Sequence, residues 1–394
     1  MTISNRSLTD RIAEIDEEMR EWRHDFHMHP ELRFEEFRTA RIVKEKLLAW
    51  GFEVHEGLGG TGVVGVLKSG VDNGKSIGIR ADMDALPLQE IGDHAHRSLV
   101  DGKMHACGHD GHTATLLGAA KYLAETRNFS GTINLIFQPG EEGGAGAQKM
   151  IEDGLFRRFP CDAIYGLHNM PQIPAGEFGI RKGPLMAARD NLEITVHGNG
   201  GHAAMPHLTV DPISISVQIY TAAQTFVSRE LDPFDNVVIS ITQFHAGTAN
   251  NIIPDTASLS ASIRTMNKET QSKIRDYFQR LCNSVADQHG IEITCDYIVG
   301  YPVTVNNGQN VDKIVKAAKT IAGEKAVDTD CEALMGSEDF SYMLEACPGA
   351  YIFLGGGDDG HQFSVHNPRY DYNDDILKIG ATLWATLVEQ ELPV

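Results

Sequence analysis

The sequence predicts an α/β fold in two domains, with the second domain inserted into the first. Short β-type runs alternate with helical stretches in the first part of the chain, which is typical of a mainly parallel sheet flanked by helices. The order of elements changes in the middle of the chain and returns near its end. The length of 394 residues also favours two domains, because a single hydrophobic core usually stops growing at roughly 250–300 residues.

The predicted first domain begins with two helices. Apolar side chains at spacings of three and four residues line the first helix, which Pro30 ends: Leu8, Ile12, Ile15, Met19, Trp22 and Phe26. The second helix covers 37–50 and stops at Gly51. Later segments then alternate, with β-type runs at 63–67, 76–82, 132–137 and 163–168 and helices at 113–125 and 145–156. These segments predict a mixed, mainly parallel sheet flanked by helices.

The middle of the chain has a different order of elements. Strands are predicted at 191–198, 236–244, 257–265 and 291–298, and helices at 211–227 and 267–290. The resulting order, β-α-β-β-α-β, is that of the ferredoxin-like α+β unit. A helix at 311–323, a strand at 350–356 and a helix at 376–390 then continue the first pattern. We therefore expect one domain built from 1–184 and 298–394, with a second domain, 185–297, inserted into it.

Composition and charge exclude several classes of protein. The formal net charge of −20 argues against nucleic acid or an anionic membrane as a partner. No apolar run approaches the ~20 residues of a membrane span, and the N-terminal segment MTISNRSLTDRIAEIDEE lacks an apolar signal core. The six cysteines show no CxxC pairs, which favours reduced thiols over a disulfide framework. The sequence thus predicts a cytoplasmic protein with no nucleic-acid or membrane partner.

Three of the predicted strands run directly into polar clusters. They lead into Asp82-Met83-Asp84, into QPGEE and into His168-Asn169. Ligands of open α/β sheets bind just beyond the carboxyl ends of the strands. We therefore expect these polar side chains to converge along one edge of the sheet.

The stretch GKMHACGHDGH, residues 102–112, contains four potential metal ligands: His105, Cys107, His109 and His112. A closed structural zinc site needs four Cys or His ligands, usually as two spaced pairs, and no second pair follows. A nucleophilic Cys107 would need a base, which His105 or His109 could supply. A further alternative is that these histidines lie in a glycine-rich surface loop and have no catalytic or metal-binding role. The stretch alone does not separate these alternatives from half of a catalytic metal centre.

Adjacent glutamates, Glu141 and Glu142, follow an apolar strand in QPGEEGGAG. Such a pair is by itself more often a solvated turn. Adjacent side chains point in different directions, however, so one carboxylate can bind metal while the other acts as general base on the attacking water. Two metal ions that share one ligand would leave room for water and use five donors, which the chain offers in Cys107, His109, Glu142, His168 and His366.

The chain resembles the M20 metallopeptidase and amidohydrolase family, in particular its branch of hippurate hydrolases, N-acyl-L-amino-acid amidohydrolases and auxin-conjugate hydrolases. The resemblance runs nearly end to end. It rests on WRHDFHMHPELRFEE, RADMDALP, MHACGHDGHTA, FQPGEEGGAGA, GLHNMP, GGHAAMPH, GTANNIIPDTASLSASIRT, GSEDFSYM and SVHNPRYDYND. Any one of these segments is a weak signal, whereas nine in order are very specific.

The resemblance implies a zinc-peptidase-like catalytic domain with two metal ions, and an inserted domain that acts as lid and dimerisation domain. It implies that Cys107 bridges the two ions. His109 and His168 would then bind one ion, and Glu142 and His366 the other.

The resemblance also assigns supporting roles. Glu141 resembles the general base. Other branches of the family carry a His-x-Asp motif where this chain has Arg80-Ala81-Asp82. Arg80 stays protonated and cannot replace that histidine as a ligand, and the cysteine branch uses His109 instead. We expect Asp82 to orient a ligand, and His105 and His112 to be supporting residues.

Three further residues of the predicted inserted domain carry expected roles in binding. His202, in Gly201-His202-Ala203, resembles the histidine that reaches the scissile carbonyl. Asn251 and Arg264 resemble the residues that hold the carboxylate of the substrate. The planar fork of an arginine suits a carboxylate.

We therefore expect a metal-dependent amidohydrolase that cleaves N-acyl-L-amino acids (hippurate-like, N-acetyl or indole-acetyl conjugates) to a carboxylic acid and a free amino acid. The expected cofactors are two divalent ions per subunit, Mn²⁺ or Zn²⁺, and Co²⁺ or Ni²⁺ would also suit the donors. The expected assembly is a homodimer, or a dimer of dimers. The alternatives are a dipeptidase or carboxypeptidase of the same family and a catalytically silent ligand-binding relative. Glu141 argues against the silent relative, because a binding protein needs no general base.

Overall fold

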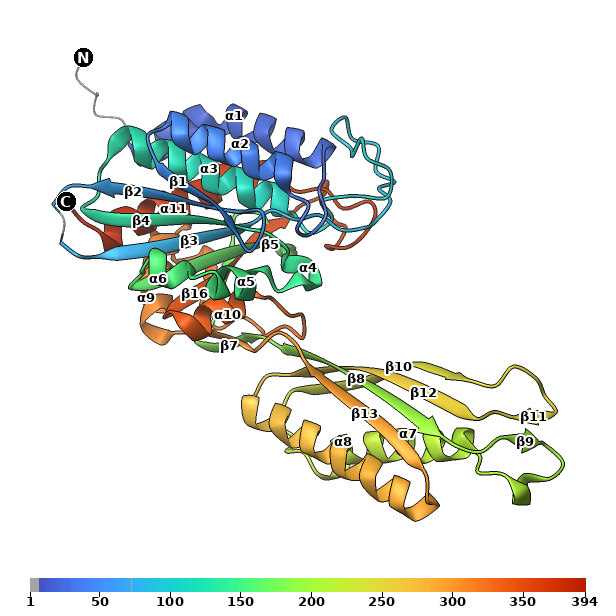
Figure 1. The fold of residues 1–394 in the computed structure, drawn as a ribbon. Coiled ribbons are helices and arrows are strands. Elements are labelled where there is room, and N and C mark those ends of the chain that lie inside the picture. Colours follow the sequence, from blue (N-terminus) through green and yellow to red (C-terminus); the bar gives the residue numbers. More distant parts are fainter. Residues whose placement is uncertain (1–6, 72) are drawn as a thin grey trace. The chain divides into compact units, whose positions relative to one another are not determined.

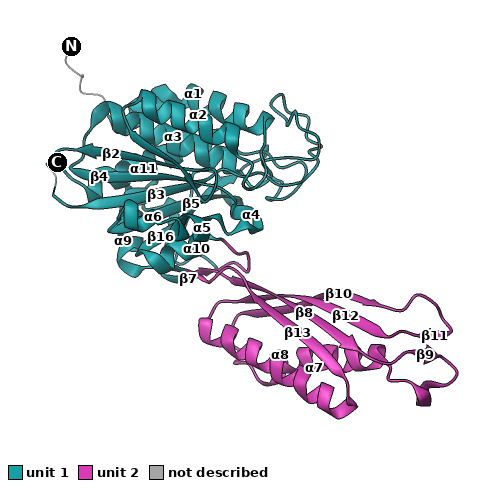
Figure 2. Cartoon of the chain, in the orientation of Figure 1, with its two compact units in different colours: residues 1–183, 305–332, 339–394 teal, residues 184–304, 333–338 magenta. Residues whose placement is uncertain are grey.

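The computed structural model describes residues 7–71 and 73–394. The chain divides into two compact units (Figure 2). Unit 1 consists of residues 1–183, 305–332 and 339–394, and unit 2 of residues 184–304 and 333–338. The main crossings between the units fall in β7 (Gly183–Met186) and β14 (Thr304–Asn306).

Unit 1 is built on a mixed sheet, which has eight strands within the described residues in the order β1-β2-β4-β3-β5-β16-β6-β15. The central strands β4, β3, β5 and β16 are parallel to one another, whereas β1, β2 and β4 pair antiparallel. The mainly parallel sheet that the sequence predicts is therefore confirmed. The strands are β1 (Glu53–Leu58), β2 (Gly62–Ser69), β3 (Ser76–Asp82), β4 (Gly131–Gln138), β5 (Ala163–Pro174), β6 (Phe178–Gly179), β15 (Val327–Asp328) and β16 (Gly349–Gly357).

Helices cover both faces of this sheet (Figure 1). The long helices α1, α2 and α3 lie over one face, and the short helices α5 and α10 lie over the other. In the described part of the chain, no helix is both long and apolar enough to cross a lipid bilayer. The helices of unit 1 are α1 (Leu8–Met28), α2 (Phe37–Ala49), α3 (His109–Thr126), α4 (Glu141–Gly144), α5 (Gly146–Glu152), α6 (Leu155–Arg158), α9 (Gly308–Ala322), α10 (Phe340–Ala346) and α11 (Leu377–Glu391).

Most of the predicted apolar face of α1 is buried, together with two polar residues, Arg23 and His27. The Ser7 side chain accepts a hydrogen bond from the backbone N–H of Asp10 and caps the helix. Arg23 lies among the buried apolar residues of the helix and is itself fully buried. A buried guanidinium needs carboxylate partners, and it finds them in Asp110 and Asp371. The helix therefore carries a charged contact as well as a hydrophobic one.

Two helix boundaries differ from the sequence prediction. The single helix predicted at 145–156 is wrong, because Gly154 adopts a φ of 90° and separates α5 from α6. The helix predicted at 113–125 begins earlier, at His109, directly after Gly108 with a φ of 88°. His109 and His112 consequently lie three residues apart on the first turn of α3, where side chains share a face.

Unit 2 has the ferredoxin-like topology that the sequence predicts. Among the described residues its sheet has four strands in the order β10-β12-β8-β13, all antiparallel neighbours. Helices α7 and α8 pack against one face of it. The elements are β8 (Ala188–His197), β9 (Gly201–His202), α7 (Pro212–Arg229), β10 (Val237–Ala246), β11 (Ile252–Ile253), β12 (Thr256–Thr265), α8 (Lys268–His289) and β13 (Glu292–Val299).

The division between the units lies some residues away from the boundary expected at 297/298. The structure places it at 304/305, and it also joins residues 333–338 to unit 2. Backbone hydrogen bonds explain both shifts. Arg189 N–H donates to the Tyr301 carbonyl at 3.0 Å, and Ala187 N–H donates to the Leu334 carbonyl at 3.0 Å. Both segments are thus held beside the start of β8.

Candidate metal centre

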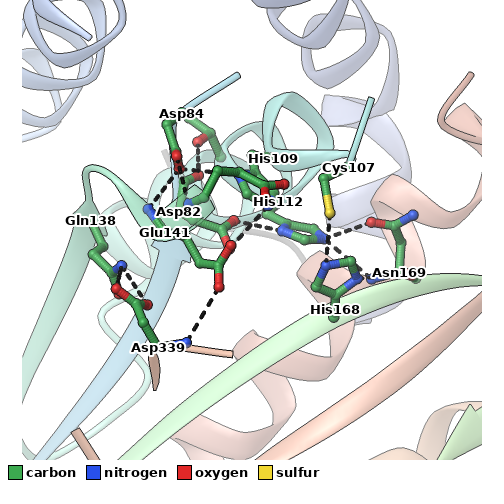
Figure 3. Close-up of polar contacts among 12 residues, drawn as sticks. Asp82, Asp84, Cys107, His109, His112, Gln138, Glu141, His168, Asn169 and Asp339 are labelled. Atoms are coloured by element: carbon green, nitrogen blue, oxygen red, sulfur yellow. Dashed lines mark hydrogen bonds and ion pairs between the residues drawn. The ribbon is translucent and has the colours of Figure 1, made fainter. Parts of the chain in front are cut away.

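Polar side chains of unit 1 gather where the central parallel strands end (Figure 3). Asp82 is the last residue of β3, and Glu141 and Glu142 follow β4, its parallel neighbour. His168 lies on β5, which pairs with β3 on the other side. Cys107 precedes α3 in the long segment after β3. Parallel pairing therefore brings residues that are far apart in sequence to one place.

Five donor side chains form two groups of three that share Cys107. In each group the donor atoms lie within 4.8 Å of one another. Cys107 Sγ is 3.3 Å from Nε2 of His168, and Nε2 of His366 is 3.1 Å from Oε1 of Glu142. The groups are Cys107, His109 and His168, and Cys107, Glu142 and His366.

Two donor atoms in these groups are buried without a hydrogen bond to any described residue. They are Nε2 of His109 and Oε1 of Glu142. A buried polar atom left without a partner costs roughly 1–3 kcal/mol. A cation bound between the donors would remove that cost, and thiolate, imidazole and carboxylate are all ligands of divalent metals. The residues therefore fit a divalent metal ion in each group.

The carboxylate of Asp84 holds three parts of the centre in place. Its Oδ1 lies 3.2 Å from Nδ1 of His109 and accepts from the backbone N–H of Glu141 at 3.0 Å. Its Oδ2 accepts from the N–H of Glu142 at 2.9 Å. Sequence reasoning gave the orienting role to Asp82 and missed Asp84. The signal was present, because Asp84 lies two residues beyond Asp82 in the polar cluster that follows β3.

Asp82 orients His112 rather than His109 Nδ1. Its Oδ1 is 2.6 Å from Nδ1 of His112, whereas its Oδ2 is 3.6 Å from Nε2 of His109. Arg80 donates to Oδ2 of Asp82 at 2.8 Å, so this arginine acts as a fixed counter-charge. His105 is buried nearby, and neither of its ring nitrogens bonds to a described residue.

Glu141 is buried and held from two sides. Its Oε1 accepts from the backbone N–H of Asp339 at 3.3 Å, in addition to the contact of its own N–H with Asp84. Asp339 is in turn fixed by Arg80 at 3.1 Å and by Gln138 at 2.8 Å. Glu141 belongs to neither donor group, although Glu142, its neighbour in the chain, belongs to one.

The electrostatics argue against a thiol nucleophile. Burial raises the pKa of Cys107 well above that of a free thiol, and the charge of Glu142 raises it further. Burial lowers the pKa of His168 well below its usual value. A reactive cysteine needs a depressed pKa, so the raised pKa counts against a nucleophile in the metal-free protein. The charge of His109, whose own pKa is raised, acts in the opposite direction on Cys107, and a bound cation would act in the same way as that charge.

His202 and Asn251 lie together in unit 2. His202 ends β9, which pairs with β11 so that His202 is opposite Ile252. The N–H of Ala203 donates to the carbonyl of Asn251 at 3.1 Å. Nδ1 of His202 accepts from the N–H of Ala204 at 3.1 Å, so a neutral ring carries its hydrogen on Nε2. The exposed Nε2–H is then available as a donor.

Arg264 lies on the face of β12 that does not pack on the helices. Residues alternate along this strand, and Arg264 shares its half-buried side with Ser262 and Ser260. Its Nη1 donates to the hydroxyl of Ser337 at 3.0 Å. Burial and then the nearby charge of Arg189 lower its pKa, and the charge of Asp190 acts in the opposite direction.

Comparison with protein families decides the classification. The model of peptidase family M20/M25/M40 matches residues 78–390, well over half of the 394 residues. The chain belongs to this family, M20. It is a hydrolase, and its donor groups fit divalent metal ions.

Individual relatives within family M20 match over nearly their full length. Hippurate hydrolase of Campylobacter jejuni is 44% identical over 97% of this chain and 98% of its own. Thermostable carboxypeptidase 2 of Saccharolobus solfataricus is 41% identical over 96% of this chain and 97% of its own. The crystal structure of the Bacillus subtilis YXEP protein, a dinuclear metal-binding peptidase of family M20, matches with a TM-score of 0.83 at 32% identity. That comparison covers 95% of this chain and 98% of the other.

We predict that Asp84→Asn weakens metal binding about 10–100-fold, which is typical for the loss of a carboxylate that orients a histidine ligand. The affinity is measured by competition between the metal-free protein and a chromophoric zinc chelator. Asp101→Asn is the control, because Asp101 is exposed. An Asp84→Asn affinity equal to that of the control would contradict the role of Asp84.

Proposed function

We propose that this M20 hydrolase cleaves the amide bond of N-acyl-L-amino acids, giving a carboxylic acid and a free amino acid. The observation that carries the proposal is the pair Glu141 and Glu142. Glu142 lies in a donor group, while Glu141 lies beside the donors, buried and held by Asp84 and Asp339. These contacts support the proposal that Glu142 binds metal and that Glu141 transfers protons.

Two divalent ions are the proposed cofactors. Bound there, they would polarise the scissile carbonyl and acidify the attacking water. A thiolate with imidazoles and a carboxylate suits Zn²⁺ and Mn²⁺, and also accepts Co²⁺ and Ni²⁺. Cys107 would be shared by the two ions, with the remaining donors divided as His109 and His168 for one and Glu142 and His366 for the other.

The chain supplies the proton transfer and the stabilisation of charge. Glu141 takes a proton from the attacking water and delivers it to the amine nitrogen as the C–N bond breaks. The Nε2–H of His202 donates to the carbonyl oxygen as negative charge develops there. Arg264 and Asn251 hold the carboxylate of the amino acid, which selects substrates that carry this group.

We further propose that the protein works in the cytoplasm as a homodimer, or as a dimer of dimers. All six cysteines are free thiols in the structure, which agrees with a reducing compartment. The dimer matters for chemistry, because we propose that His202 completes the active site of the partner subunit. A twofold interface is self-complementary, so each of the two sites would be completed in the same way.

A second candidate function is that of a metal carboxypeptidase, since a carboxypeptidase is 41% identical to this chain.

We expect the metal-loaded protein to hydrolyse benzoyl- and acetyl-amino acids faster than unblocked dipeptides and faster than the matching N-acyl amino acid amides. We also expect Arg264→Ala to erase most of the preference for acid over amide. Loss of a charge-assisted hydrogen bond of ~1.5–3 kcal/mol corresponds to about 10–100-fold in kcat/KM.

Arg280→Ala is the matched control for this panel, because it removes an exposed arginine of unit 2 that lies on α8 and not beside Arg264. Faster cleavage of unblocked dipeptides would favour the carboxypeptidase. An unchanged ratio of acid to amide in Arg264→Ala would remove Arg264 from carboxylate binding.

The arrangement of His202 in trans predicts complementation between two inactive variants. A mixed dimer of Glu141→Ala and His202→Ala chains has one doubly defective site and one intact site. Random pairing makes half of the dimers mixed, with half of their sites intact, so co-expression restores up to about a quarter of wild-type activity. The measurement is turnover of an N-acyl amino acid by the co-expressed pair and by each variant alone. With subunit exchange verified by mass spectrometry, a mixture as inactive as its components would place His202 in its own chain's site.

A further inference from the structure

A second cluster of histidines and carboxylates lies outside the two groups that share Cys107. It forms where the last turn of α1 meets the long segment 83–108 that joins β3 to α3 (Figure 1). The side chains of His27, Glu90 and His94 form its centre, and they are called the loop triad below. His27 is fully buried, and the Glu90 and His94 side chains are 2% and 18% exposed.

The donor atoms of the loop triad converge on one point. Oε1 of Glu90 lies 3.2 Å from Nε2 of His27 and 2.7 Å from Nε2 of His94, and all three atoms lie within 4.8 Å of one another. Donors around a tetrahedral zinc ion are roughly 3.3 Å apart, because each bond is about 2.0–2.1 Å long. The triad therefore needs only a small outward shift to accept an ion.

One of these atoms shows the same feature as the donors near Cys107. Nε2 of His94 is buried, yet it makes no hydrogen bond of acceptable geometry within the described chain. It lies 2.7 Å from Oε1 of Glu90, an ion-pair contact that helps to lower the pKa of Glu90. Oε1 of Glu142 makes the same kind of contact, an ion pair at 3.1 Å with Nε2 of His366 and no further hydrogen bond to a described residue. Two ligands that face a common cation produce this pattern.

We propose that the loop triad is a third divalent metal site, with Nε2 of His27, Oε1 of Glu90 and Nε2 of His94 as ligands. The outer contacts that orient metal ligands are in place. Nδ1 of His27 lies 2.8 Å from Oδ2 of Asp110, and Oε2 of Glu90 accepts from the N–H of Ser98 at 2.6 Å. The partly exposed side of His94 leaves an entry path and room for a water ligand.

The neighbouring histidine, His96, is excluded from this ligand set by Arg23. Nη1 of Arg23 lies 2.6 Å from Nε2 of His96, so the arginine occupies the lone pair that a metal would need. Asp371 is engaged by the same guanidinium. The group His94, His96 and Asp371 is therefore held by an arginine, whereas the loop triad has no arginine among its described contacts.

The local charge favours a divalent cation. Four carboxylates, those of Glu90, Asp110, Asp371 and Asp374, surround the cluster, and Arg23 pairs with the last three. With the histidines neutral, as they are when they bind metal, the sum is one positive and four negative charges, or −3. Glu90 has only histidines and the Ser98 N–H as described partners. A divalent ion would offset two of these three negative charges.

The proposed ion would fasten the segment that carries Cys107. The triad joins α1 to residues 90 and 94 of that segment, and the Leu99 N–H donates to the Met28 carbonyl at 2.9 Å beside it. Asp110, which contacts His27, is the residue after His109 in α3. The role of the third ion is thus to position the segment, and the ion contributes no donor to the chemistry.

The test is a count of bound zinc. Metal-free protein is titrated with Zn²⁺ alone and the bound ions per chain are counted by native mass spectrometry. We expect three ions in the wild type, and two in both His94→Ala and Glu90→Gln. Glu142→Ala removes an ion from a different site, so Glu142→Ala with His94→Ala should retain one. The ion lost in His94→Ala and the ion lost in Glu142→Ala add independently. Failure of the third site can therefore be told apart from failure of the proposed function.

His24→Ala is the matched control and should keep all three ions. His24 stacks on His96 and contacts Asp374, but it does not belong to the triad. The rival explanation of the cluster is a protonated His27 in place of a metal ion. Burial lowers the pKa of His27, but Asp110 and Glu90 raise it to about 9 overall. The imidazolium of His27 can therefore pair with both carboxylates without metal. A wild type that binds no more zinc than folded His94→Ala and Glu90→Gln would overturn the proposal in favour of this ion pair.

Discussion

The metal centre depends on one carboxylate, that of Asp84, which makes three contacts. It receives the N–H groups of Glu141 and Glu142 and lies against Nδ1 of His109. These contacts connect the ends of β3 and β4 with the first turn of α3. They fix the turn from which the side chains of Glu141 and Glu142 point in different directions. They also leave Nε2 of His109 facing Cys107. Parallel pairing of the strands brings these parts together, and Asp84 sets their orientation.

Charge explains why so many ionisable groups are buried in one region. Cys107 has a raised pKa, and Glu142 and His109 hold donor atoms that lack hydrogen bonds to described residues. Donor atoms without hydrogen bonds are unfavourable in a metal-free protein, and a cation beside Cys107 would lower its raised pKa. The loop triad repeats the pattern on the other side of Asp110. The acidic interior of unit 1 is therefore best understood as a scaffold for divalent ions, with Arg23 and Arg80 balancing the carboxylates that orient the ligands.

The architecture could be predicted from the sequence, and the features that the sequence did not reveal have physical reasons. Apolar periodicity and the order of elements were sufficient for the mainly parallel sheet and the ferredoxin-like unit. The donors near Cys107 were named partly from motifs at strand ends and partly from the resemblance to family M20; the structure brings them together, and their binding of metal stays a prediction. Asp84 was overlooked because its role depends on backbone N–H groups 57 residues away. The break at Gly154 depends on a positive φ that periodicity does not reveal. The loop triad joins a helix end to an aperiodic loop, and only the fold shows that His27 and His94 are neighbours.

The division of labour between Glu141 and Glu142 is the central claim, and metal content tests it most directly. Glu141→Ala and Glu142→Ala differ by one position, and each is compared with wild-type protein for bound ions per chain and for turnover. The account predicts that Glu141→Ala keeps every ion and loses about 10²–10⁴-fold in kcat, as expected for the loss of a general base. It predicts that Glu142→Ala loses one ion. Full metal content in both variants, or the loss of an ion by Glu141→Ala alone, would contradict it.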